Sequence, residues 1–375
     1  MTIAILQPLG LGDGILSLSI VQTLKQTIPE AKVMMVVRRT LIDIVAHHPD
    51  VHSVIPIRNE QSMARRFFTL VSELSDLSCD TAIICPGSLT VALAAAAARI
   101  PRRIGSDQTL GLDLFAHAVR YPRLQYQTDG AFLISVLDRL ARRVNRPSIA
   151  SLLFTDVVPF TPASHAIERF CSLLHPLGIY TQPVPPKIYS PLEEIANPGD
   201  ETVIRGDAGP IALVPGSRWA TKRWGETRYA QLAVELTKKY PEKDILLCGH
   251  TDDSELCGKI LELMDAPRVK NISGRFSLLE LSGIFRRCAV VIGNDSGAGH
   301  CAAAVGTPVV TLFGPTIPGF GFTPLSPKSE VCEGVPLECR PCGPYGGSVC
   351  PVKSHECMTS ISVESVVNAV ERIIH

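Results

Sequence analysis

Apolar runs with the length of β-strands alternate with longer segments of helical periodicity along most of the chain. Near the N-terminus, strand-like runs at 3–6 and 32–37 enclose a helical pattern at 14–27. The alternation returns at 211–216 and continues through a run at 308–314. Because two parallel strands are joined by a crossover, usually a helix, this order predicts βαβ units. The fold class is therefore α/β, with doubly wound parallel sheets.

The alternation pauses between about 155 and 210, where proline and turn-forming residues dominate. A chain of 375 residues has room for two domains of about 150 residues each. The predicted parts are an N-terminal α/β domain at 1–165, a linker region at 166–208, a C-terminal α/β domain with a cysteine-rich loop at 209–358, and a C-terminal helix at 359–375. A ligand-binding cleft is expected between the two domains.

Composition and charge exclude several classes of protein. With 46% hydrophobic and 19% charged residues, the chain has the composition of a globular protein. Its formal net charge is zero, which argues against nucleic acid bound on a broad basic face. The longest apolar run, 91–100, is shorter than the roughly 18 residues that span a bilayer, and no basic segment precedes the first apolar run. We therefore expect a cytoplasmic protein whose cysteines are mostly reduced and buried.

The first strand-like run is followed by PLGLGDG, which places Gly10, Gly12 and Gly14 around Asp13. A dinucleotide-binding loop has the spacing G-x-G-x-x-G, but Ile15 stands where the third glycine is required. A carboxylate at the start of a helix would also repel a pyrophosphate bound there. Two interpretations of Asp13 stay open. Either it caps the helix, or it is a base that the helix dipole keeps ionised, beside glycines that let a substrate approach.

A second loop follows the apolar run IALVP and brings Ser217, Thr221 and Lys222 to the start of another helix. Two hydroxyls and an ammonium in that position suit phosphate oxygens. The loop lacks the Gly-Lys-Ser/Thr ending of a P-loop, so ATP hydrolysis of that kind is not indicated. The alternative is a basic surface loop with Trp219 and Trp224 packed beneath it.

The third loop, GNDSGAGH at 293–300, joins a strand-like run to an alanine-rich helical segment. Ser296 and Gly297 leave the first N–H groups of that helix accessible to an anion. We expect Asp295 to cap the helix. His300 either donates to the same phosphates or is a buried structural histidine.

These loops, together with the opening segment at 9–33 and RIPRRIG at 99–105, resemble glycosyltransferase family 9, the heptosyltransferases that build the inner core of bacterial lipopolysaccharide. The matching segments keep the family's order over nearly the whole chain. The resemblance implies a GT-B fold, in which two α/β domains face each other across a cleft. It further implies that the acceptor binds the N-terminal domain, that the nucleotide sugar binds the C-terminal one, and that the C-terminal helix packs back on the N-terminal domain.

The resemblance also implies an inverting, metal-independent transfer of heptose from ADP-heptose to a Kdo or heptose acceptor, with no cofactor. Asp13 matches the catalytic base that takes the proton of the acceptor hydroxyl. Lys222 and the start of the third-loop helix would supply the positive charge that other transferases take from a metal. Asp252 and Phe276 are expected near the ribose and the base. The donor diphosphate is expected at Ser217, Thr221, Lys222, Ser296, Gly297 and His300.

The acceptor implied by the resemblance is an anionic lipid-linked sugar. Arginine supplies 14 of the 16 basic residues up to residue 165, and its guanidinium binds carboxylate and phosphate bidentately. Because such an acceptor lies at the inner membrane, we expect peripheral contact with the inner face of that membrane, and no nucleic-acid partner. The residues expected at the acceptor are Gly12, Arg65, Arg66, Arg102, Arg103 and Arg120.

The segment at 332–357 is rich in cysteine. Cys339, Cys342, Cys350 and Cys357 offer four sulfurs, although their spacing is not that of a standard zinc ribbon. A structural zinc or iron–sulfur site, paired cysteines and free thiols are the three alternatives. In each case we expect the cysteines to stabilise a loop that lacks an apolar core of its own.

Three rival functions stay open. A nucleotide-dependent oxidoreductase would use Arg38 and Arg39 to read a 2′-phosphate, but the glycine spacing and Asp13 argue against it. A non-catalytic relative would bind the nucleotide sugar without a base. A transferase could also move another nucleotide-activated sugar to a cell-surface glycan.

Overall fold

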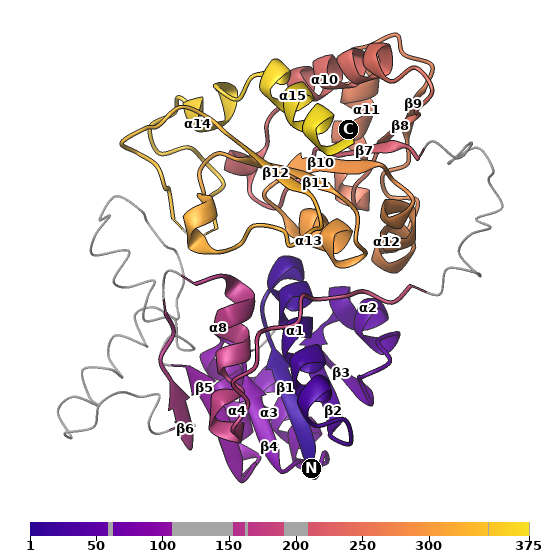
Figure 1. Ribbon diagram of the computed structural model, residues 1–375. Helices are drawn as coiled ribbons and strands as arrows, with labels where there is room; N and C mark the ends of the chain where they lie inside the picture. The colour runs from indigo at the N-terminus through magenta and orange to yellow at the C-terminus, as the bar shows by residue number, and fades with distance from the viewer. Residues whose placement is uncertain (59–62, 107–152, 162–163, 191–208, 344, 375) are drawn as a thin grey trace. The chain divides into compact units, whose positions relative to one another are not determined.

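Two compact units, Met1–Pro186 and Lys187–His375, make up the computed structural model (Figure 1). Each unit has its own parallel sheet and its own apolar core. The structure describes residues 1–58, 63–106, 153–161, 164–190, 209–343 and 345–374.

The first unit is built on a six-stranded parallel sheet with the order β3-β2-β1-β4-β5-β6. The chain starts in the middle of the sheet, moves outward to one edge and then returns to build the other half. This is the strand order of a doubly wound nucleotide-binding sheet. The strands are β1 (Thr2–Gln7), β2 (Lys32–Arg38), β3 (Ser53–Ile57), β4 (Thr81–Ile84), β5 (Arg102–Ser106) and β6 (Asp156–Val158).

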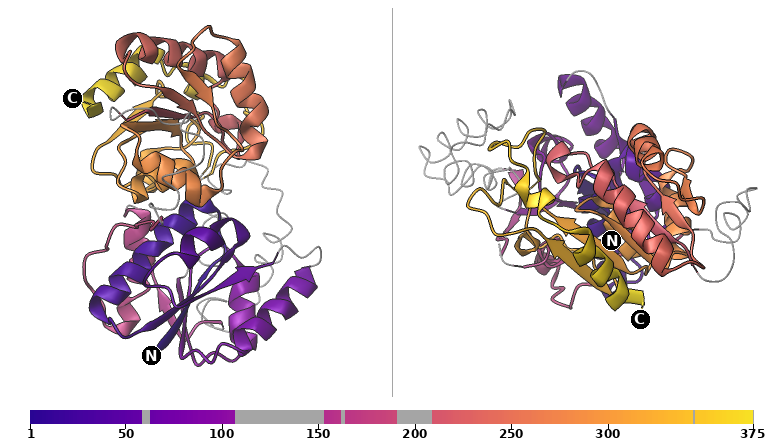
Figure 2. Two further views of the ribbon diagram at one scale, coloured as in Figure 1. Left: turned by 90° about the vertical axis from the view of Figure 1, so that its right-hand side faces the viewer. Right: turned by 90° about the horizontal axis from the view of Figure 1, so that it is seen from above.

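Helices cover both faces of this sheet (Figure 2). Leu70 of α3 and Ala95 of α4 share one core with Leu6 of β1. α1 packs against α8, where the Ser19 hydroxyl lies 3.2 Å from the Cys171 thiol. The helices are α1 (Leu11–Thr27), η1 (Arg39–Leu41), α2 (Ile42–Ala46), α3 (Met63–Ser75), α4 (Leu89–Ala97), α8 (Ala166–Ser172) and η2 (His175–Leu177).

The second unit repeats the plan with a parallel sheet in the order β12-β11-β10-β7-β8-β9. Its first strand, β7, again lies near the centre, so the chain winds outward in both directions. The loops that leave β7 and β10 therefore emerge side by side at the carboxyl edge of the sheet, where ligands bind in folds of this type. The strands are β7 (Ile211–Val214), β8 (Ile245–Leu247), β9 (Val269–Asn271), β10 (Val290–Asn294), β11 (Val309–Phe313) and β12 (Ser329–Glu333).

One apolar core joins helices α10, α11 and α15 to this second sheet. Leu236 of α10, Ile260 of α11 and Val370 of α15 are all buried in it. The helices of the second unit are η3 (Ala220–Lys222), α10 (Glu226–Lys239), η4 (Thr251–Asp253), α11 (Ser254–Glu262), α12 (Leu278–Arg286), α13 (Gly297–Ala304), η5 (Pro318–Phe320), α14 (Glu356–Thr359) and α15 (Val363–Ile374). Within the described residues, every helix is too short or too polar to span a lipid bilayer.

The structure refines the predicted domain limits. The units divide after Pro186, inside the predicted linker region 166–208, because α8 within that region packs on α1 of the first unit. The C-terminal helix α15 buries its apolar face in the core of the second unit, and its packing on the N-terminal domain stays a prediction. An ion pair between Glu371 of α15 and Lys239 of α10 adds to the packing within the second unit.

Candidate functional site

Asp13 lies in the first turn of α1, half-buried. The helix begins at Leu11 and its N-cap is Gly10, so the interpretation of Asp13 as the cap is wrong. The positive end of the helix dipole favours the ionised form of a carboxylate at this position. Burial, with the charge of Asp13 as a further cause, raises the pKa of the Cys85 thiol, which follows β4.

The glycines around Asp13 have different structural roles. A Cβ on Gly14 would lie 2.1 Å from Cδ1 of Leu41, so this glycine lets α1 pack closely on its neighbour. A Cβ on Gly10 would have no atom within 4 Å. Gly12 is partly exposed in the first helical turn. Gly14 therefore serves the packing of α1, and a role in letting a substrate approach stays a prediction for Gly12.

The second predicted loop packs against the second unit with its candidate phosphate-binding residues buried. Ser217, Thr221 and Lys222 are all buried, so the loop is not a basic surface loop. Trp224 is buried, whereas Trp219 is only partly buried, and the backbone N–H of Trp224 donates to Asn294 Oδ1 at 3.3 Å. This hydrogen bond ties the loop after β7 to the end of β10.

A buried ion pair connects the second and third predicted loops. Lys222 Nζ donates to Asp295 Oδ2 at 2.6 Å, and each of the two side chains is only 10% exposed. The hydroxyl of Thr316, which follows β11, donates to the same oxygen at 2.7 Å. An ammonium has three N–H donors, so the bond to Asp295 leaves two with which Lys222 can bind an anion.

The start of α13 lies directly after this ion pair in the sequence. Its N-cap is Ser296, whose side chain makes no capping hydrogen bond, and Gly297 is the first helical residue. The expectation that Asp295 caps this helix is wrong, because its carboxylate binds Lys222 and Thr316. His300 is buried in the second turn. The helix start and the Lys222 ammonium together form a site suited to phosphate oxygens.

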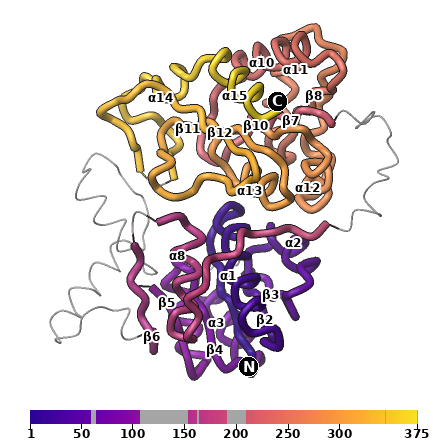
Figure 3. The backbone as a smooth tube through the Cα atoms, in the orientation of Figure 1, coloured from indigo at the N-terminus to yellow at the C-terminus, as the bar shows by residue number. Residues whose placement is uncertain are grey.

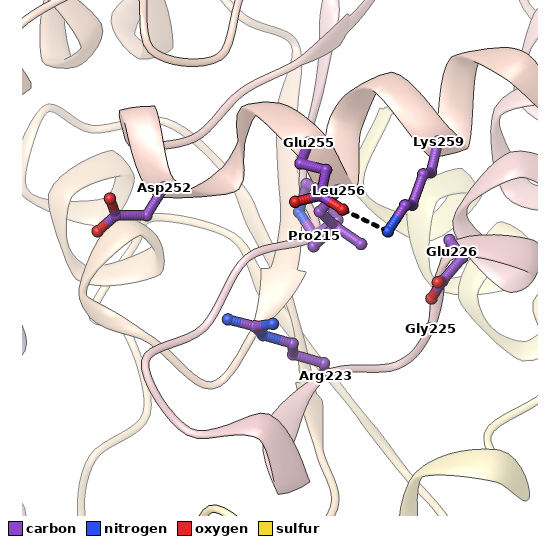
Figure 4. A pocket seen from close by; sticks show the side chains of 8 residues that line it. All are labelled: Pro215, Arg223, Gly225, Glu226, Asp252, Glu255, Leu256 and Lys259. Atoms are coloured by element: carbon purple, nitrogen blue, oxygen red, sulfur yellow. Dashed lines mark hydrogen bonds and ion pairs between the residues drawn. The ribbon is translucent and has the colours of Figure 1, made fainter.

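A cavity of about 220 Å³ lies beside the loop after β7, between α10 and α11 (Figure 4). Asp252 stands at its rim with a side chain that is 91% exposed, directed away from the ion pair of Glu255 and Lys259. Phe276 is half-buried after β9, with the Arg275 guanidinium 5.7 Å from its ring centre. The residues that line the cavity include Asp252 but not Phe276.

Asp253, rather than Asp252, is the acidic residue that covers the ends of β7 and β8. A Cβ on Gly216 would meet Asp253 Oδ1 at 2.2 Å, and one on Gly249 would meet its Cβ at 2.7 Å. Neither Asp253 nor Thr316 is among the site residues predicted from the sequence. The signal for both was their position just after a strand-like run, where parallel sheets collect their ligand-binding residues.

Two of the expected acceptor arginines have structural partners within the first unit. Arg102 forms an ion pair with Asp156 at 3.1 Å, and this contact lowers the pKa of the Asp156 carboxyl. Arg103 donates to the carbonyls of Leu153 and Ile100, both at 2.7 Å.

Arg65 is exposed and Arg66 half-buried on α3. Arg120 lies outside the described residues, as does most of the segment that follows β5.

All twelve cysteines are described, and none is joined in a disulfide. Nine are buried, as expected, whereas Cys339 is exposed and Cys342 and Cys350 are partly exposed. Burial raises the pKa of the Cys342 thiol to about 11, and the charges of Cys357, Cys339 and Cys350 act in the same direction. Within the described part of the chain, no three His, Cys, Asp or Glu side chains are grouped so that they could hold a metal ion.

Comparison with known sequences identifies proteins related to this chain. Residues 123–350 match the family model Glycosyltransferase family 9 (heptosyltransferase). Lipopolysaccharide heptosyltransferase 2 of Salmonella typhimurium is 25% identical over 348 residues, which cover 88% of this chain and 87% of the relative. Lipopolysaccharide heptosyltransferase 1 of Pseudomonas aeruginosa is 25% identical over 354 residues, covering 91% and 86%.

Solved structures agree on the fold. The E. coli ADP-heptose lps heptosyltransferase II superposes with a TM-score of 0.72 at 22% identity, over 100% of this chain and 98% of that one. The E. coli heptosyltransferase WaaC with ADP has a TM-score of 0.69 at 18% identity, over 99% of both chains. The two doubly wound units therefore have the GT-B type of fold. From the family match and the length of these alignments, the chain belongs to glycosyltransferase family 9, the heptosyltransferases, and is a glycosyltransferase.

Proposed function

We propose that this glycosyltransferase moves a heptose from ADP-heptose to the inner core of lipopolysaccharide, with Kdo or heptose as acceptor. Its relatives carry the names of lipopolysaccharide heptosyltransferases. WaaC has been solved with ADP and with ADP-2-deoxy-2-fluoro heptose. The observation that carries the proposal is the buried pair of Lys222 and Asp295 at the start of α13, because it provides a cation and free helix N–H groups at one place.

The donor diphosphate binds where these groups meet. The two remaining N–H donors of Lys222 and the first N–H groups of α13, beginning at Gly297, bind its oxygens. The side chains of Ser217, Thr221, Ser296 and His300 complete this part of the site. Asp252 and Phe276 stay our candidates for the nucleoside. When the bond to the sugar breaks, the negative charge that develops on ADP is stabilised by fixed positive groups, so the transfer proceeds without a divalent metal.

Asp13 is the base of the proposed reaction. It accepts the proton of the acceptor hydroxyl while that oxygen attacks the anomeric carbon of the heptose. ADP leaves from the opposite side of the same carbon with the electron pair of the broken bond, so the configuration inverts. Because the acceptor hydroxyl is neutral, the carboxylate meets no phosphate at this point, which explains why a helix start suited to anions carries an acidic residue.

The acceptor binds the first unit at Gly12 and at the arginines of α3, Arg65 and Arg66. Arg120 stays a candidate for the same role. We leave Arg102 and Arg103 out of the acceptor site because their guanidiniums are used by Asp156 and by backbone carbonyls. A lipid-linked acceptor brings the enzyme to the inner face of the inner membrane as a peripheral, cytoplasmic protein.

A transfer assay with ADP-heptose and a lipopolysaccharide precursor tests the role of Asp13. We expect Asp13→Asn to lower turnover by about 10²- to 10⁴-fold, the usual contribution of a general base, while ADP binding is retained. Asp43→Asn is the control, because Asp43 is an exposed carboxylate in the first turn of α2. Turnover of Asp13→Asn equal to that of the control would exclude Asp13 as the base.

The same assay separates the remaining functions. Turnover with a different nucleotide sugar but none with ADP-heptose would replace the proposed donor. Binding of ADP-heptose without turnover by the unmodified protein would favour a non-catalytic binding protein.

A further inference from the structure

The cysteine-rich loop, residues 334–343 and 345–357, runs from β12 into the start of α14 (Figure 3). The described part of this loop contacts the donor site at two separate points. The first contact, through Arg340, is with the segment after β11, and the second, through Gly346, Gly347 and His355, is with η3. Neither contact involves a thiol.

The first contact is made by the guanidinium of Arg340, whose side chain is only 9% exposed. Its Nη2 donates to the carbonyls of Phe313 at 3.2 Å and Thr316 at 2.9 Å, and it also forms an ion pair with Glu333. Thr316 is the residue whose hydroxyl binds Asp295. Arg340 therefore fixes the backbone of a residue that orients the Asp295 carboxylate.

The second contact reaches Lys222 from the other side. Gly347 exchanges hydrogen bonds with Thr221: its N–H donates to Oγ1 at 2.8 Å, and its carbonyl accepts from the Thr221 N–H at 3.1 Å. The His355 Nε2 lies 2.7 Å from the Thr221 carbonyl. Gly346 packs on the stem of Lys222, since a Cβ there would lie 3.2 Å from its Cγ.

We propose that the cysteine-rich loop is a clamp on the donor diphosphate site, and that Arg340 is a positioning residue that acts through Asp295 and Lys222. The loop contacts Thr221 and Lys222 on one side of this network and Thr316 on the other, and Asp295 lies between them. Buried side chains that share one network hold each other in place, so loosening one anchor displaces the Lys222 ammonium. This inference rests on the proposed donor site.

The first test is Arg340→Met, which keeps an unbranched apolar stem and removes the guanidinium with its donors. The matched control is Arg372→Met. Arg372 on α15 also forms an ion pair with a glutamate of β12, Glu330, but its side chain is 56% exposed and it lies outside the loop. Titration calorimetry with ADP is expected to give a dissociation constant about tenfold higher for Arg340→Met, a loss of about 1.4 kcal/mol. The control is expected to stay within about twofold of the unmodified protein.

A double-mutant cycle with Lys222→Ala shows whether Arg340 acts through Lys222. If it does, adding Arg340→Met to Lys222→Ala leaves the ADP dissociation constant unchanged within about twofold, because coupled residues are not additive. A residue that only supports the general fold would weaken ADP binding by the same factor in both backgrounds. Additive effects would therefore overturn the positioning role.

Two glycine variants test the clamp independently of Arg340→Met. Gly346 has φ +82° and lies against Lys222, whereas Gly306 has φ +85° with no atom within 4 Å of its Cβ position. Alanine strains the backbone equally at both, so both variants lose similar stability. Only Gly346→Ala is expected to weaken ADP binding, and equal ADP affinities for the two variants would overturn the clamp. If the unmodified protein does not bind ADP at all, the proposed donor fails, and the clamp fails with it.

Discussion

Lys222 and Asp295 form a buried ion pair, with Nζ 2.6 Å from Oδ2, although 73 residues separate them in the sequence. The pair joins the loop after β7 to the loop after β10, and these two strands are direct neighbours in the sheet. The Thr316 hydroxyl adds a third group to the same oxygen. The proposed phosphate-binding ammonium is thus held in place before any donor arrives, which lowers the cost of binding.

Removing the charge of Asp295 should strongly destabilise the second unit. Asp295→Asn leaves the Lys222 ammonium buried without its counter-charge, and breaking a buried pair in this way costs about 3–5 kcal/mol. Urea unfolding measures the loss. The control is Glu235→Gln, which removes the exposed pair of Glu235 with Lys238 and should cost less than about 1 kcal/mol. Equal losses for the two variants would show that the ion pair is not buried as described.

Gly14 should be required by packing rather than by backbone conformation. Gly14→Ala places a methyl group 2.1 Å from the present position of Leu41 Cδ1, and overpacking of this kind costs about 1–3 kcal/mol. Gly10→Ala, with open space around it, should change stability by less than about 0.5 kcal/mol. Thermal unfolding compares the two. In a Leu41→Ala background the cost of Gly14→Ala should nearly vanish, and an unchanged cost there would contradict this contact.

His48 should make the first unit sensitive to acid. Burial lowers its pKa from 6.5 to about 4, against the smaller raising effect of Asp50. The pKa of His48 is lower in the folded protein than in the unfolded one. The first unit therefore has its full stability above about pH 6.5, and its free energy of unfolding falls by up to about 3 kcal/mol as the pH drops toward 4.

The variant His48→Asn isolates this effect, because an Asn side chain keeps an acceptor for the Asp50 N–H and does not titrate. Its stability should fall less between pH 7 and 4.5 than that of the unmodified protein, as measured by urea unfolding at each pH. His47→Asn, an exposed neighbour, serves as the control. Parallel pH profiles for His48→Asn and the unmodified protein would rule out a buried neutral His48.

The βαβ order and the position of most strands could be predicted from the sequence, because strands buried on both faces are continuous apolar runs. The start of α1 could not. Glycine has a low helix propensity, so residues 10–14 indicate a loop, but the packing of Gly14 on Leu41 overrides that preference. The helix within the proline-rich region could be recognised at 165–178, but its packing on α1, which places α8 in the first unit, could not.

Only part of the candidate site could be predicted, because only some of its residues form a local pattern in the sequence. Ser217, Thr221 and Lys222 could be recognised because they follow a strand and precede a helix within a few residues. The partner of Lys222 could not, since a contact across 73 residues leaves no local pattern. Arg340 was missed for the same reason, as its partners lie on β11, β12 and the turn that follows β11.

The most direct test of the proposed donor site is calorimetric titration of the unmodified protein with ADP and with UDP, in the absence of divalent metal, alongside Lys222→Ala and Lys238→Ala. We predict that ADP binds the unmodified protein and the exposed-lysine control equally, and that Lys222→Ala weakens ADP binding at least tenfold, about 1.4 kcal/mol. A melting curve for each variant confirms that it is folded. Binding of UDP in place of ADP would contradict the proposed donor, and ADP binding unchanged in folded Lys222→Ala would contradict the site itself.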